Sequence, residues 1–130
     1  MQKRIYYHDT DAGGVVYYSN YLKYMEEARI DFFHKHGLDE TSLNGKPVFF
    51  PVRQCNITYH KPAVYGDTIQ CSAEISKITP ARIIFSQQVT NNKTSELLVE
   101  AEVTLACVSA KDFKPIRLPE NIKNLQCSKS

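Results

Sequence analysis

The chain has 130 residues, of which 42% are hydrophobic and 23% are charged, and this composition is typical of one soluble globular domain spanning residues 1–130. Its 16 basic and 14 acidic side chains give a net charge of +2, which argues against binding nucleic acid or an acidic membrane through bulk charge. No apolar run approaches the roughly 20 residues of a membrane-spanning helix. Residues 1–7 lack the apolar stretch of a secretory signal, so we expect a cytoplasmic protein.

The cysteines and histidines show no metal-binding pattern. The four cysteines form no C-x-x-C pair and have no zinc-like spacing; they are Cys55, Cys71, Cys107 and Cys127. In a reducing compartment we expect free thiols that pack as small apolar side chains. His34 and His36 are two residues apart on a predicted helix and face different directions, so we expect no metal chelate there.

The first part of the chain is predicted to form a short strand over residues 4–7, a loop over 9–15 and a long helix over 19–36. In the helical segment, apolar and aromatic side chains recur at three- and four-residue steps; they include Tyr21, Met25, Ala28, Phe32 and Phe33. Ser19 or Asn20 is the predicted N-cap. Gly37 is the predicted left-handed residue that ends the helix.

After residue 48 the hydrophobic period changes to two, which predicts strands. The predicted strands cover residues 53–59, 69–76, 82–90 and 97–107, and a short amphipathic segment follows near residues 122–125. One long helix followed by antiparallel strands is an α+β pattern, and the economical packing wraps the sheet around the helix. A short sheet leaves exposed edges, which an edge-to-edge dimer would cover.

The most unusual segment is residues 6–18, in which Asp9 and Asp11 precede the pair Gly13-Gly14 and a helix begins shortly afterwards. Glycine lets the backbone approach a ligand closely. The first amides of a helix have no intrahelical acceptor and carry partial positive charge. A carboxylate beside such amides provides a base or nucleophile together with donors for the oxyanion that forms when a carbonyl is attacked.

A purely structural alternative is an Asx turn in which Asp9 and Asp11 cap backbone amides, and the residue pattern alone leaves this alternative open. A calcium loop is disfavoured because Gly13 offers no side-chain oxygen and no carboxylate lies near Asn20. An Asp-x-Asp phosphatase is disfavoured because the period-two strands do not indicate a parallel sheet. No serine or cysteine has the context of a nucleophile elbow.

The segment YHDTDAGGVVYYSNYL at residues 7–22, followed by Glu26, Ala28 and Arg29, resembles the 4-hydroxybenzoyl-CoA thioesterase-like hot-dog family. Within that family it is most similar to the YbgC-type acyl-CoA thioesterases associated with the Tol–Pal system. The resemblance implies a hot-dog fold, with an antiparallel sheet wrapped around one central helix. It also implies homodimers or homotetramers with active sites at the subunit interface, and no metal or redox cofactor.

The same resemblance implies roles for individual residues. Asp11 is the expected catalytic carboxylate, and the backbone amide of Tyr18 is the expected oxyanion-hole donor that polarises the thioester carbonyl. The residues expected to contact the substrate are Gly14, Val15, Tyr17 and, on the helix, Glu26. YbgC-type members usually carry histidine at the position of Tyr18, whereas the hydroxybenzoyl subgroup carries tyrosine, so only the backbone role of this position is transferred.

These features predict an enzyme that hydrolyses acyl-coenzyme A to a free acid and coenzyme A. Asp11 acts either as nucleophile or as general base, and because a carboxylate with a pKa near 4 is a weak base, the nucleophilic role is favoured. The alternative is a non-catalytic protein that binds acyl-CoA or contacts an acyl carrier protein. A dehydratase is a weaker alternative, because no histidine is clearly paired with a carboxylate.

Overall fold

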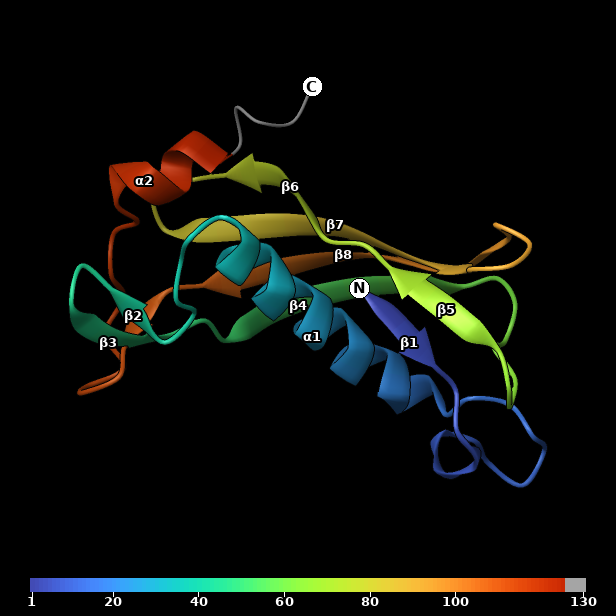
Figure 1. Ribbon diagram of the computed structural model, residues 1–130. Coiled ribbons are helices and arrows are strands. Elements are labelled where there is room, and N and C mark those ends of the chain that lie inside the picture. The colour runs from blue at the N-terminus through green and yellow to red at the C-terminus, as the bar shows by residue number, and fades with distance from the viewer. Residues whose placement is uncertain (126–130) are drawn as a thin grey trace.

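The computed structural model describes residues 1–125, in which a curved antiparallel sheet wraps around one long helix (Figure 1). The main sheet has the order β1 (Gln2–Arg4), β5 (Thr68–Cys71), β7 (Arg82–Asn91), β8 (Leu97–Ala106) and β4 (Val52–Tyr59), and β6 (Glu74–Ile78) also pairs with β7. A smaller sheet, which the sequence analysis did not predict, joins β2 (Ser42–Leu43), β3 (Lys46–Phe49) and β9 (Val108–Ser109). The predicted α+β class is confirmed.

The long helix α1 spans Tyr18–Lys35, so the prediction of residues 19–36 was correct to within one residue at each end. The predicted N-cap was wrong. Tyr17 occupies the N-cap position without a side-chain cap, and Asn20 lies inside the first turn. Gly37 follows the helix at a φ of +74°, the left-handed conformation that glycine adopts without steric cost.

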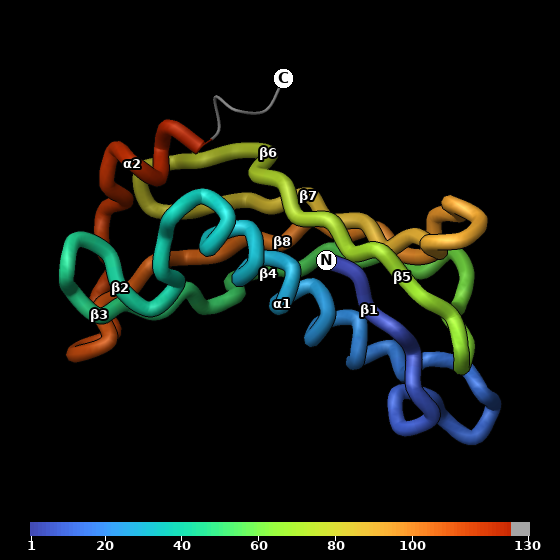
Figure 2. Tube along the Cα trace, viewed as in Figure 1, coloured from blue at the N-terminus to red at the C-terminus, as the bar shows by residue number. Residues whose placement is uncertain are grey.

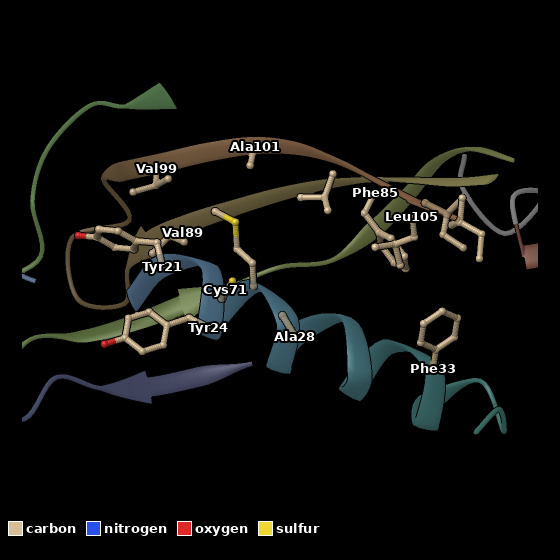
Figure 3. Packing of buried hydrophobic residues seen from close by; sticks show 14 of the residues in the cluster. Tyr21, Tyr24, Ala28, Phe33, Cys71, Phe85, Val89, Val99, Ala101 and Leu105 are labelled. Atoms are coloured by element: carbon tan, nitrogen blue, oxygen red, sulfur yellow. The ribbon is translucent and has the colours of Figure 1, made fainter. Parts of the chain in front are cut away.

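The core lies between α1 and the inner face of the sheet (Figure 3). Tyr21, Ala28 and Phe33 on the helix point toward the strands, and the rings of Phe33 and Phe85 meet edge to face with centroids 5.9 Å apart. Full burial of one large apolar side chain contributes about 1.5–3 kcal/mol to folding. This packing fixes the helix against the sheet and thereby fixes the position of the helix N-terminus.

Strands β5 and β6 form one bent strand, interrupted at residues 72–73, against a continuous β7 (Figure 2). Cys71 pairs with Val89 and Glu74 pairs with Ser86, so no residue is inserted at the break. The single strand predicted over residues 69–76 is therefore two strands. At the break, side chains replace part of the backbone ladder, because Gln87 Nε2 donates to the Ser72 carbonyl at 3.1 Å.

Gln87 also connects this break to the helix. Its Nε2 donates to the Met25 carbonyl at 3.0 Å, and its Oε1 accepts a hydrogen bond from Arg29 Nη1 at 2.9 Å. Gln87 is fully buried and Arg29 is only 7% exposed. Burial lowers the pKa of Arg29, and the negative charge of Glu26 opposes that shift.

The chain ends differ from prediction in detail. The first strand ends at Arg4, and a short 3₁₀ helix, η1 (Tyr7–Asp9), follows where the strand was expected to continue. The short helix α2 (Glu120–Lys123) lies near the predicted amphipathic segment.

Cys55, Cys71 and Cys107 are free thiols, as predicted, while Cys127 lies outside the described residues. No helix within residues 1–125 is long and apolar enough to cross a membrane.

Candidate active site

The loop between η1 and α1 is a tight turn around Asp11. The Asp11 amide donates to the Val15 carbonyl at 2.8 Å, and the Gly14 amide donates to the Asp11 carbonyl at 3.0 Å. Gly14 has a φ of +79°, a conformation that a residue with a side chain rarely adopts. The turn therefore needs its second glycine, and the backbone places Asp11 opposite Val15.

The Asp11 carboxylate uses one oxygen to hold this turn. Its Oδ1 accepts hydrogen bonds from the Gly13 amide at 2.8 Å and, more weakly, from the Val15 amide at 3.4 Å. The Asx turn considered as a structural alternative is therefore present at Asp11. Within residues 1–125 no group donates a hydrogen bond to the second oxygen, Oδ2, and the residue is partly exposed. One carboxylate oxygen thus remains available for chemistry.

Asp9 has a different environment from Asp11. It is only 6% exposed, and its Oδ2 accepts a hydrogen bond from the Tyr6 amide at 2.9 Å. Burial by itself raises the pKa of Asp9, but the Tyr6 amide, the Tyr24 hydroxyl and the positive charge of Lys3 together lower it below its ordinary value. Asp9 is therefore a buried structural anion, whereas Asp11 is only partly buried.

The lowered pKa of Asp9 predicts a pH-dependent stability. The unfolded chain binds more protons at acidic pH than the folded chain, so the stabilisation by Asp9 is complete above about pH 4 and is lost as the pH falls through the folded pKa. The Asp9→Asn variant should be less stable than the wild type at neutral pH, and the difference should shrink as the solution is acidified. Urea midpoints of both proteins between about pH 7 and pH 3 measure this; a difference that is constant with pH would contradict it.

The N-terminus of α1 presents two open backbone amides. Within residues 1–125, neither the Tyr18 amide nor the Ser19 amide donates a hydrogen bond, whereas the Asn20 amide donates to the Tyr17 carbonyl at 3.0 Å. The first turn also contains no acidic side chain. No side chain of that turn therefore offsets its partial positive charge, which can stabilise a negative charge that develops beside it.

A pocket of about 200 Å³ lies beside this helix end, and it is lined by Val15, Tyr18, Tyr21, Tyr59, His60, Lys61 and Pro62. The ring centroids of Tyr18 and Tyr59 are 4.7 Å apart, so aromatic faces form part of its wall. Val15 joins the pocket to the Asp11 turn, because its amide contacts Asp11 Oδ1 while the residue lines the pocket. The sequence did not identify Tyr59 as a pocket residue, because its place in a pattern of alternating apolar and polar residues predicts only a strand.

The predicted substrate-binding residues fall into two places. Gly14, Val15 and Tyr17 belong to the turn next to Asp11 and Tyr18. Glu26 lies eight residues beyond Tyr18, about 12 Å along the helix axis, and lines a different pocket of about 210 Å³ with Arg29 and Phe33. Within one chain, Glu26 therefore lies apart from Asp11. The contact of Glu26 with substrate stays a prediction. No group of three metal-ligating side chains converges within residues 1–125.

Comparisons with known proteins agree with this architecture. Residues 6–125 match the Thioesterase-like superfamily. Acyl-CoA thioester hydrolase YbgC of Escherichia coli O157:H7 is 37% identical over 119 residues, which cover 92% of this chain and 88% of that protein.

Two solved structures extend the likeness to the fold. DHNA-CoA thioesterase from Staphylococcus aureus superposes with a TM-score of 0.89 at 27% identity, over 98% of this chain and 89% of that one. A probable thioesterase from Bartonella henselae superposes with a TM-score of 0.84 at 32% identity, over 92% and 97% of the two chains. The sheet wrapped around α1 is thus the hot-dog arrangement of these enzymes, and the chain belongs to the Thioesterase-like superfamily.

Proposed function

We propose that this protein hydrolyses acyl-coenzyme A thioesters, with Asp11 as the catalytic carboxylate. The observation that carries the proposal is the available Oδ2 of Asp11 on a turn that leads directly into the open amides of α1. The names of the YbgC relatives, which are acyl-CoA thioester hydrolases, support the choice of substrate. The pocket beside Tyr18 is large enough for a small acyl group, since a cavity of about 150 Å³ holds benzene.

In the favoured mechanism, Asp11 Oδ2 attacks the carbonyl carbon of the thioester. The carbonyl electron pair moves onto the oxygen, and the Tyr18 amide donates a hydrogen bond to that oxyanion. Collapse of the tetrahedral intermediate expels the coenzyme A thiolate, which is then protonated from solvent, and leaves a mixed anhydride on Asp11. Water hydrolyses the anhydride and regenerates the carboxylate. In the general-base route, Asp11 instead removes a proton from the water that attacks the thioester.

We further propose that the active form is an oligomer. β4 is an edge strand of the main sheet that pairs only with β8 in the described chain, and Val52 and Tyr59 at its two ends are 50% and 38% exposed. An open edge of this length is normally covered. Pairing of β4 with a second copy would place residues of the partner next to the pocket at Tyr59. Dimer or tetramer, cytoplasmic location and contact with an acyl carrier protein stay predictions.

A panel of acyl-CoA substrates tests the proposed function directly. The purified protein should release free coenzyme A thiol from at least one member of a panel that includes short, long and aromatic acyl groups. Release is followed with a thiol reagent, against a blank of protein without substrate. Saturable binding of an acyl-CoA without release of thiol on any member would instead support the binding-protein alternative.

A further inference from the structure

One side chain fastens the Asp11 loop to the first turn of the helix. Asn20, the third residue of α1, donates from Nδ2 to the Asp9 carbonyl at 2.9 Å. The Tyr17 amide donates to the same carbonyl at 3.2 Å. Asn20 is half-buried, and a side-chain amide held in this way has lost its rotational freedom.

This carbonyl lies at the base of the Asp11 turn. Asp9 is fixed on its other side by the Tyr6 amide, and the turn above it closes through the pairing of Thr10 with Val16. The Asp9 carbonyl is therefore the point where the turn and the helix N-terminus meet. Without the Asn20 bond, the weaker 3.2 Å bond from Tyr17 would be the sole remaining donor to this oxygen among residues 1–125.

We propose that Asn20 is a positioning residue, which holds Asp11 in register with the Tyr18 amide by fastening the Asp9 carbonyl to α1. This inference rests on the proposed function, since it assigns Asn20 no contact with substrate. The relative position of Asp11 and the Tyr18 amide matters because a nucleophile and an oxyanion donor must act on the same carbonyl group. A displacement of about 1 Å at such a site costs about 100-fold in rate.

Three substitutions at Asn20 test the positioning role. Asn20→Asp keeps the size of the side chain but removes its N–H donor, and a carboxylate in the first turn of a helix favours the helix dipole. Asn20→Ala removes the donor without adding charge. Both variants should lower kcat by about 10- to 100-fold and leave KM within about threefold, and thermal unfolding should show both folded at the assay temperature. Asn20→Gln, which retains an amide donor on a longer side chain, should recover part of the loss.

Asn92→Ala is the control, because Asn92 is exposed and contributes its backbone amide, which donates to the Thr68 carbonyl at 2.8 Å, while its side chain makes no hydrogen bond within residues 1–125. It should leave kcat and KM unchanged. The inference is overturned if Asn20→Ala retains wild-type kcat. If Asn20→Asp is then still impaired and its pH–rate profile moves to higher pH, the loss is an effect of the added charge on Asp11. Failure of the proposed function is recognised separately, by an Asp11→Asn variant that keeps full activity.

Discussion

Replacing Asp11 with asparagine is expected to lower kcat for thioester hydrolysis by about 1000-fold or more, the scale seen when a catalytic nucleophile or base is removed. Asparagine keeps an oxygen that accepts the hydrogen bond from the Gly13 amide, so the turn should persist. It lacks the ionised oxygen that attacks the carbonyl or accepts a proton from water. The measurement is kcat and KM on the best acyl-CoA of the panel, with the Tm as a check on folding.

Asp39→Asn provides a control for the same chemical change in a similar Asx turn. Asp39 Oδ1 accepts a hydrogen bond from the Thr41 amide at 2.8 Å, which is also the distance from Asp11 Oδ1 to the Gly13 amide. Asp39 lies in the loop after α1, at the opposite end of the helix from the candidate site. Its variant should remain fully active. An Asp11→Asn variant that is as active as a fully active Asp39→Asn variant would refute the catalytic assignment.

An isotope experiment distinguishes the two roles of Asp11. After a single turnover in oxygen-18 water, label in the Asp11 side chain establishes the nucleophilic route. Label confined to the product acid, together with the absence of an acylated Asp11 peptide after rapid quenching, establishes the general-base route. The distinction matters because the covalent route places the acyl group on the loop that Asn20 holds.

Replacing Gln87 with methionine is expected to lower the free energy of unfolding by about 3 kcal/mol or more, the scale for removing the partner of a buried charged group. Methionine has a similar length and fills the same space, so little cavity forms. The Arg29 guanidinium and the Ser72 carbonyl each lose a hydrogen-bond partner. The corresponding decrease in Tm is about 10 °C for a domain of this size, measured by thermal and urea unfolding.

A second substitution tests whether the unpaired charge causes this loss. Arg29→Met in the Gln87→Met background replaces the buried pair with apolar side chains, and such replacements are often neutral or stabilising. The double variant should therefore be more stable than Gln87→Met alone. A double variant that is no more stable would show that the loss arises from the break at Ser72 instead, where Gln87 also donates.

The long helix and the strand region were predictable because their hydrophobic periods of 3.6 and two are sustained over many residues. The N-cap was not, because Ser19 and Asn20 have suitable side chains but Asn20 makes a contact with the Asp9 carbonyl across the loop instead. The break at residues 72–73 was also not predictable from alternation. It depends on Gln87, a polar residue at an inward position between Phe85 and Val89, whose role is visible only when the strand partner and the helix are known.

The candidate site was predictable only in part. The segment from Asp9 to Tyr18 identified the loop and the helix end, because carboxylates, glycines and a helix start occur together there. The different environments of Asp9 and Asp11 depend on the burial of Asp9 and on the influence of the Tyr24 hydroxyl from the helix, neither of which the local sequence encodes. Tyr59 approaches Tyr18 from a strand 41 residues away, so only the folded chain brings the two rings together.

The open edge at β4 would link the stability of this fold to the concentration of whatever molecule covers it. Any strand that pairs with β4 in the folded chain, and not in the unfolded one, shifts the unfolding equilibrium by mass action. If that strand belongs to a second copy, the midpoint of thermal unfolding rises as the protein is concentrated; if it belongs to another molecule, the midpoint rises with the amount of that molecule. A dilution series followed by calorimetry therefore reports whether a second copy pairs with the protein, without any assay of turnover.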